Sequence, residues 1–281
     1  MENHEVSSTT VRGLERGEIE SVIPEIVRVF RDDEVLPWHR TDSCKALVTK
    51  RAERGFYITL AYCGEKLLGY SEWIETHDRG RMLLYLGMMQ VDCDFRGRGI
   101  GTAMLKNGEE YAKDIGASCL RTIPEDERSH AFYRKYGFFD NDKIYYCACP
   151  VMADAKEEKR GEPVAVTLNN ANSRELIFGL CQSSGRHMYE VANHNPGGEF
   201  RVVSAHIHGG YLQLRHKQGA KTALAIYWSN EEVTADIVAA ILRSGYSEGF
   251  DEIEFYFRSK YLHLFAAQKA SVESVEMERE I

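Results

Sequence analysis

The sequence lacks a long apolar run: no stretch reaches the ~18 apolar residues that a membrane-spanning helix needs. Its first residues, Met-Glu-Asn-His-Glu, contain neither a basic start nor an apolar segment, so no signal peptide is expected. It also lacks a surplus of lysine and arginine, and its formal net charge of -8 argues against nucleic-acid or anionic-membrane binding. We therefore expect a cytoplasmic protein with no nucleic-acid or membrane partner.

The sequence has too few cysteines in too irregular a pattern for a disulfide framework. There are seven, scattered and often inside apolar runs, which is typical of reduced thiols in a cytoplasm. Two pairs with i, i+2 spacing, Cys147 with Cys149 and His206 with His208, would each share one face of a strand. Neither pair has further ligands at suitable spacing, so no metal site is expected.

Two common phosphate-binding patterns are missing as well. The sequence contains no G-x-x-x-x-G-K-[ST] segment, and G-x-G-x-x-G is not matched because the third glycine of Gly97, Gly99 and Gly101 arrives one residue early. Neither a P-loop nucleotide hydrolase nor a dinucleotide-binding Rossmann domain is therefore expected.

The first half of the chain has alternating helical and strand periodicities. Pro24 falls inside the first helical run, so that helix is kinked or starts only there, and Thr41 or Asp42 is a candidate cap for the second helix. The order predicts an α/β fold (an α+β mixed sheet) whose central strand–helix–strand unit is parallel. The predicted elements are strand Thr9–Leu14, helices Glu18–Phe30 and 41–54, strands Phe56–Cys63, Lys66–Thr76 and Arg81–Val91, helix Ile100–Ile115, strand Ser118–Ile123, helix Glu127–Tyr136 and strand Lys143–Cys149.

The composition changes after Pro150. Residues 151–163 are rich in charge and read as an exposed linker, which divides the chain into domains at 1–150 and 164–281. The second domain is predicted to be a smaller α/β domain, and the charged tail after Ala267 is expected to be frayed. Its predicted elements are strands Phe200–His208, Tyr211–His216 and Thr222–Trp228, a helix Val233–Arg243 that ends near Gly245, and strand Glu252–Phe257.

The most informative segment is a glycine-rich turn between a strand and a helix, Val91-Asp-Cys-Asp-Phe-Arg-Gly-Arg-Gly-Ile-Gly-Thr102. Alternate glycines let successive backbone N–H groups point into one concavity, and the helix N-terminus adds unpaired donors and partial positive charge. Such a turn suits a phosphate or pyrophosphate, with Arg96 and Arg98 adding charge. The alternative is a tight turn that needs glycine only for its backbone angles.

Two segments resemble the GNAT superfamily of N-acetyltransferases. Arg96-Gly-Arg-Gly-Ile-Gly101 is similar to the family signature R/Q-x-x-G-x-G/A, and Ala131-Phe-Tyr-Arg-Lys-Tyr-Gly-Phe138 is similar to its A-x-Y-x-K-x-G-F segment. The resemblance covers about residues 7–150. It implies that acetyl-CoA lies in a split between two parallel strands, with its pyrophosphate on the glycine turn. The implied cofactor contacts are Met89, Val91, Arg96, Gly97, Arg98, Gly99, Ile100, Gly101 and Thr102.

The resemblance also implies a reaction in which an amine attacks the thioester directly. Tyr133 occupies the position where the family has a tyrosine near the CoA sulfur, and a phenol, with an ordinary pKa near 10, suits a general acid for the thiolate. Where many relatives carry asparagine, this sequence has Asp126, which keeps an acceptor oxygen but lacks the amide donor and could instead cap a helix.

The sequence does not single out the general base or the acceptor site. Glu72 and Glu75 lie three apart on one strand and so face opposite sides; Tyr85 and a water chain are the other options. Trp38 could stack on a cationic amine attracted by Asp32, Asp33 and Glu34, or it could be buried beside a solvated loop.

The second half contains no catalytic motif. Its order of elements over Tyr211–Phe257 resembles weakly a degenerate GNAT-like half, which could complete a cleft, extend a sheet or form a homodimer. The whole pattern predicts an N-acetyltransferase that uses acetyl-CoA, without a metal, on a primary amine of a small molecule or peptide. The alternative is a non-catalytic protein that binds acyl-CoA as a sensor.

Overall fold

The computed structural model describes residues 9–32, 38, 40–78, 80–151, 175–179 and 200–281. Contacts divide the chain into two compact units. The first comprises Met1–Glu75, Met82–Thr122 and Glu280–Ile281, and the second comprises Thr76–Arg81 and Ile123–Arg279. This division does not coincide with the predicted boundary at residue 150, which stays a prediction. All but the first residue of the predicted 151–163 linker lies outside the described residues.

The first unit is a mixed sheet with helices, as the sequence predicted. Its strands lie in the order β1-β2-β3-β4-β5. The pairs β1–β2 and β2–β3 are antiparallel, whereas β4 and β5 are parallel. The elements are β1 (Thr9–Gly13), η1 (Arg16–Glu18), α1 (Ile19–Val29), α2 (Thr41–Glu53), β2 (Tyr57–Cys63), β3 (Lys66–Asp78), β4 (Arg81–Val91), η2 (Cys93–Phe95), α3 (Ile100–Asp114) and β5 (Cys119–Thr122).

Helices cover both faces of this sheet. On β3, Glu72 pairs with Arg51 of α2, whereas Glu75 accepts a 2.8 Å hydrogen bond from Tyr111 of α3. The two glutamates therefore face opposite sides, as their spacing predicted. On the α3 side, a Cβ at Gly108 would lie 2.2 Å from the Trp73 ring, so glycine is what allows α3 to approach β3 closely.

Two local predictions for the first unit need correction. Helix α1 starts at Ile19 and contains Pro24 in its interior, so it does not begin at the proline. Helix α2 has Arg40 at its N-cap and no side-chain capping bond, so neither Thr41 nor Asp42 caps it. Both residues already lie in the first helical turn, where a side chain cannot take the N-cap position.

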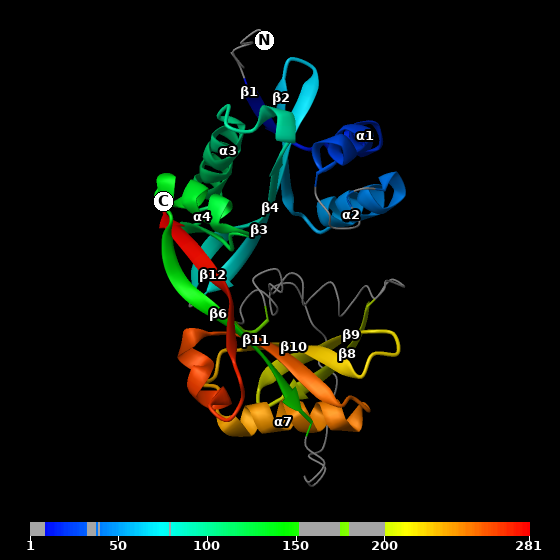
Figure 1. Ribbon diagram of the computed structural model, residues 1–281, viewed down its shortest axis with the longest axis vertical. Coiled ribbons are helices and arrows are strands. Elements are labelled where there is room, and N and C mark those ends of the chain that lie inside the picture. The colour runs from blue at the N-terminus through cyan, green and yellow to red at the C-terminus, as the bar shows by residue number, and fades with distance from the viewer. Residues whose placement is uncertain (1–8, 33–37, 39, 79, 152–174, 180–199) are drawn as a thin grey trace. The chain divides into compact units, whose positions relative to one another are not determined.

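The strands of the second unit are also mixed, and they lie in the order β12-β6-β11-β7-β10-β9-β8. Helix α7 packs its apolar side into the core formed by these strands (Figure 1). The elements are α4 (Glu127–Lys135), β6 (Phe139–Pro150), β7 (Glu175–Phe178), β8 (Phe200–Ile207), β9 (Gly210–Lys217), β10 (Thr222–Ser229), α7 (Ala235–Ser247), β11 (Glu252–Arg258), η3 (Ser259–Phe265) and β12 (Ser271–Glu280).

The predicted frayed tail is wrong, because residues 271–280 form the strand β12. This strand pairs antiparallel with β6 and buries Glu276, Met277 and Glu278. Its charges are tolerated because Arg258 pairs with Glu276 at 3.2 Å and Arg81 pairs with Glu278 at 3.0 Å.

Two further predictions for the second unit also fail. Helix α7 continues past Gly245, which lies inside the helix, where a Cβ would lie 2.5 Å from Ile253. Strand β8 ends at Ile207, and His208 lies in the following turn with φ of 44°, so it does not share a strand face with His206. The i, i+2 spacing of His206 and His208 does not place them on one strand face, because β8 ends one residue before His208.

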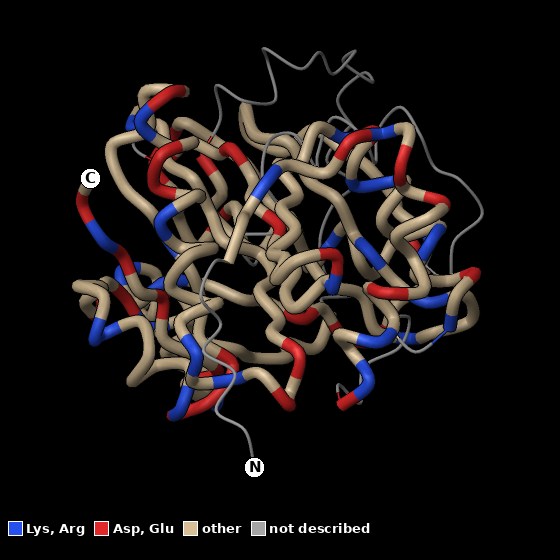
Figure 2. Tube along the Cα trace, turned by 90° about the horizontal axis from the view of Figure 1, so that it is seen from above, with Lys and Arg blue, Asp and Glu red and all other residues tan. Residues whose placement is uncertain are grey.

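Charge of both signs is spread along the described trace, with basic and acidic segments interspersed (Figure 2). None of the helices in the described ranges combines the length and the apolar character that a membrane crossing requires.

Candidate functional site

The parallel strands β4 and β5 stay paired for only part of the length of β4. Their register runs from Leu83 opposite Cys119 to Leu86 opposite Thr122, and the Thr122 hydroxyl donates to the Leu86 carbonyl at 3.2 Å. Beyond Leu86, β4 continues to Val91 without β5 beside it. Met89 and Val91 therefore lie on a stretch whose edge is not paired with β5, where a ligand can hydrogen-bond to the backbone.

The glycine-rich turn follows this unpaired stretch and leads into α3. Gly97 and Gly99 have left-handed backbone angles, with φ of 78° and 84°. No atom lies within 4 Å of the position that a Cβ would take at either residue, so the turn faces open space. Gly99 is the N-cap of α3, and the first helical bond runs from Ala103 N–H to the Gly99 carbonyl at 3.0 Å. The N–H groups of Ile100 and Gly101 precede this first helical bond, so they have no acceptor within the helix.

The two arginines of the turn differ in their surroundings. Arg96 forms an ion pair with Asp32 at 2.5 Å, and its Nε donates to the Val91 carbonyl at 3.1 Å. Arg98 is exposed, lies 5.2 Å from the centre of the Phe95 ring and makes no ion pair within the described part of the chain. The contacts of Arg96 with Asp32 and Val91 therefore hold the turn in place. The guanidinium of Arg98 can pair with a bound anion.

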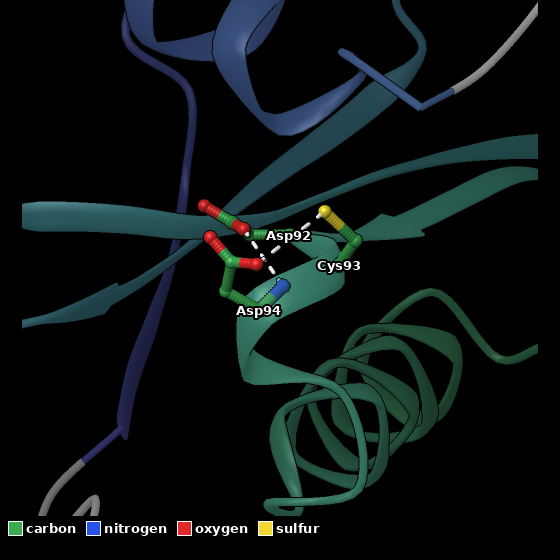
Figure 3. A group of neighbouring side chains, drawn as sticks. All are labelled: Asp92, Cys93 and Asp94. Carbon is green, nitrogen blue, oxygen red and sulfur yellow. Dashed lines mark hydrogen bonds between the residues drawn. The ribbon is translucent and has the colours of Figure 1, made fainter.

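Asp92 connects the turn to Arg28 of α1 and to Arg31 just after this helix, a role that the sequence did not reveal. Figure 3 shows Asp92 beside Cys93 and Asp94. Its side chain is fully buried and pairs with Arg28 and, at 2.7 Å, with Arg31; it also accepts from the Asp94 N–H at 3.2 Å. Burial acts to raise the pKa of Asp92, but the hydrogen bonds from Arg31, Asp94 and Arg28 outweigh it and hold this pKa below its usual value. An acidic residue directly after a strand and before a turn was the available signal.

Asp92, Cys93 and Asp94 are the one group of potential metal ligands that lie close enough together among the described residues (Figure 3). Both carboxylates are already paired with arginine: Asp94 contacts Arg31 at 2.6 Å, and Asp92 contacts Arg28 and Arg31. A cation at this point would have to displace two guanidinium groups, so the arrangement is suited to arginine.

Helix α4 carries both Tyr133 and the capping residue Asp126. The Asp126 carboxylate accepts from the Ser129 N–H at 2.7 Å, and Ser129 Oγ accepts from the Asp126 N–H at 2.9 Å, which completes a capping box. The predicted capping role is therefore confirmed. Tyr133 is buried, and its ring lies 5.3 Å from that of Phe132 and 5.4 Å from that of Phe138.

The two candidate bases or acceptor contacts on β3 and β4 are both buried. The Glu72 carboxylate is paired with Arg51 and accepts a hydrogen bond from Tyr70. Tyr85 is 4% exposed and lies opposite Arg121 of β5. Glu72 is thus engaged by a cation and a phenol within this chain.

Trp38 lies in the hydrophobic core that also contains Phe30 and Tyr70. It is 2% exposed, stacks on Phe30 with ring centres 4.1 Å apart, and has the Arg51 guanidinium 5.4 Å from its ring. Its surface is therefore largely covered by this chain's own side chains. Of the acidic residues in that connection, Asp32 pairs with Arg96, whereas Asp33 and Glu34 lie outside the described residues.

Comparisons with known proteins agree with this geometry. A family model described as the acetyltransferase (GNAT) family matches residues 23–138. An uncharacterized N-acetyltransferase of Methanocaldococcus jannaschii is 33% identical over 101 residues, 34% of this chain and 43% of that protein. The chain therefore matches less than half of that relative's length.

Two solved structures share the fold over nearly the whole chain. A GCN5-related N-acetyltransferase from Kribbella flavida has a TM-score of 0.60 at 13% identity, over 97% of this chain and 71% of the other. A putative acetyltransferase from Pyrococcus horikoshii has a TM-score of 0.60 at 12% identity, over 100% and 91%. At such identities the likeness shows the fold alone.

Residues 23–138 therefore match the GNAT acetyltransferase family, as the two sequence motifs predicted.

Proposed function

We propose that this protein is an acetyl-CoA-dependent N-acetyltransferase that acetylates a primary amine of a small molecule or peptide. The observation that carries the proposal is the end of β4 beyond its pairing with β5, which runs directly into a glycine turn and the N-terminus of α3. A family match at residues 23–138 supports the same reaction class.

The cofactor is assigned to the first unit by complementary chemistry. Donors at Gly97 to Thr102, together with the partial positive charge of the α3 N-terminus, suit the two negative charges of a pyrophosphate. The backbone at Met89 and Val91, which β5 does not reach, suits the amide groups of the pantetheine arm, because these need donors and acceptors in an extended arrangement. Arg96 holds the turn in shape through Asp32, and Arg98 supplies charge at its rim.

The proposed chemistry is direct attack of the amine nitrogen on the thioester carbonyl carbon. A C–N bond forms, the C–S bond breaks, and the acetyl group leaves the sulfur as the CoA thiolate departs. Backbone N–H groups near Met89 to Val91 would polarise the carbonyl oxygen, as in an oxyanion hole. Tyr133 would protonate the thiolate as a general acid, and the amine loses its proton to water, since Glu72 is held by Arg51 and Tyr70.

A matched pair of variants tests the role of Tyr133. Tyr133→Phe keeps the ring that packs on Phe132 and Phe138 and removes only the hydroxyl. We expect kcat to fall by about 100-fold, the scale of general acid–base catalysis, with little change in acetyl-CoA affinity. Phe132→Leu, a packing change beside it, should alter kcat by much less. Unchanged turnover in Tyr133→Phe would remove the assigned role.

A thiol-release screen separates the enzyme from a non-catalytic acyl-CoA sensor. The full-length protein is mixed with acetyl-CoA and a panel of primary amines, and free CoA thiol is measured. Amine-dependent release is the expected result. Tight acetyl-CoA binding with no release from any amine class would instead favour the sensor.

A further inference from the structure

Two cations share one aromatic ring beside the glycine turn. Lys66, the first residue of β3, places its Nζ 4.4 Å from the centre of the Phe95 ring, and Arg98 places its Cζ 5.2 Å from the same centre. Phe95 itself packs on the cluster formed by Ala61, Leu68, Ile100 and Met104, which fixes the position of the ring. The two charges are therefore held within about one Debye length, ~10 Å at 0.1 M salt.

Neither cation is neutralised by the part of the protein that the structure describes. Lys66 and Arg98 are both exposed and make no ion pair there, although Arg96 in the same turn pairs with Asp32 and Arg31 nearby pairs with Asp94. Like charges this close repel each other, and attraction to the ring offsets only part of that repulsion. An anion bound to both cations would remove the remaining repulsion.

We propose that Lys66 and Arg98 bind the 3′-phosphate of coenzyme A. This inference rests on the proposed function, because it assumes that the pyrophosphate occupies the backbone donors of the glycine turn. With those donors taken, the remaining anionic group of the cofactor is a phosphate monoester. It carries close to two negative charges at neutral pH, which two cations match.

The proposal makes Lys66 a specificity residue for the phosphorylated cofactor. Lys66 comes from a different strand than the glycine turn and follows the β2–β3 hairpin, so no motif in the turn identifies it. Phe95 acts as a positioning residue, since its ring brings the two cations together. The glycine turn alone would bind CoA and its 3′-dephospho form equally.

The experiment is calorimetric titration of the full-length protein with CoA and with 3′-dephospho-CoA. For the unmodified protein we expect the dephospho ligand to bind about tenfold more weakly, as loss of a two-cation contact implies. Lys66→Met should weaken CoA binding by about fivefold and leave dephospho-CoA binding unchanged. The dephospho ligand is thus an internal check on folding. Lys113→Met, at the far end of α3, is the matched control and should change neither affinity.

Each other outcome overturns the proposal in a recognisable way. Equal affinity of the unmodified protein for both ligands would show that the 3′-phosphate is not recognised. An equal loss for both ligands in Lys66→Met would assign the lysine to the pyrophosphate or to the fold. Binding of neither ligand by the unmodified protein would overturn the proposed function itself, and this inference with it.

Discussion

At the scale of single residues, the glycine turn is held in place by acidic and basic side chains outside the motif. Asp92 pairs the end of β4 with Arg28 of α1 and with Arg31 just after this helix, and Asp32 pairs with Arg96 of the turn. These pairs fix the backbone on which the proposed anion site depends. The glycines make the turn possible, but the ion pairs determine where it lies.

Asp92→Asn should destabilise the protein, because it leaves two guanidinium groups without their buried partner. We expect the free energy of unfolding at neutral pH to fall by about 2 kcal/mol, below the full penalty for a broken buried pair because both arginines are partly exposed. Unfolding in urea measures this change in the free energy of unfolding. Asp94→Asn, whose side chain is 74% exposed, is the control and should change stability little.

The Asp92 effect should also depend on pH in one direction. Its folded pKa lies below the ordinary aspartate value, so near pH 4 and below the unfolded state binds the proton first. The stabilisation is therefore complete above about pH 5 and is lost as the pH falls through the lowered folded pKa. The difference in free energy of unfolding between the unmodified protein and Asp92→Asn should therefore shrink as the pH falls. A difference that stays constant down to pH 2 would contradict the assignment.

Gly99→Ala should weaken acetyl-CoA binding more than Arg98→Ala. A Cβ at φ of 84° costs about 1–2 kcal/mol, and it would project into the open space where the anion is proposed to lie. We expect affinity to fall by more than about tenfold for Gly99→Ala and by about fivefold for Arg98→Ala. Gly116→Ala has similar backbone strain, at φ of 74°, and should lower stability without altering affinity.

Among the single residues of the site, the sequence predicted those whose role depends on the geometry of neighbouring residues. The turn from Val91 to Thr102 could be predicted because glycine spacing and helix capping act over a few neighbours. The different surroundings of Arg96 and Arg98 could not, since Asp32 and Lys66 are brought to the turn by other elements. Neighbours in space that are distant in sequence leave no local pattern.

At the scale of elements, α4 is the helix that bears the proposed catalytic tyrosine, and it begins at a capping box. Asp126→Ala should lower the free energy of unfolding by about 1 kcal/mol through the lost cap, whereas Asp126→Asn should retain most of it. Denaturant unfolding checks both variants. A large loss of cofactor affinity in Asp126→Asn, with stability retained, would instead assign the carboxylate to the cofactor.

The strand β12 shows where element prediction from the sequence fails. Its sequence, Ser-Val-Glu-Ser-Val-Glu-Met-Glu-Arg-Glu, is charged enough to resemble a solvated tail. It forms a strand because β6 offers it backbone partners, and because Arg258 and Arg81 pair with two of its glutamates. Glu276 and Glu278 can be buried because their arginine partners lie about 20 and 200 residues away in the sequence. The local periodicity of the sequence does not predict such distant pairs.

At the scale of the whole molecule, the compact units do not follow the chain in two consecutive pieces. The first unit is completed by the last two residues, and the second unit includes Thr76–Arg81, which runs from the end of β3 to the first residue of β4. The shift in composition after Pro150 was visible in the sequence, but the return of the C-terminal segment to β6 was not. The domain boundary predicted at residue 150 therefore needs a direct test.

A fragment of residues 1–150 should not fold on its own. Strand β6 has β11 on one side and β12 on the other, and truncation at 150 removes both. Two open edges along a 12-residue strand favour aggregation. We expect the fragment to aggregate in size-exclusion chromatography and to lack a cooperative thermal transition. A monomeric fragment that unfolds cooperatively and binds acetyl-CoA would support the boundary at 150.

The most direct test of the central claim is calorimetric titration of the full-length protein with acetyl-CoA. The account predicts one site per chain with a dissociation constant of about 1 μM, or roughly −8 kcal/mol, and a large loss of affinity in Gly99→Ala. No heat of binding at millimolar acetyl-CoA, from protein that is folded, would contradict it. The glycine turn would then be a structural connection between β4 and α3.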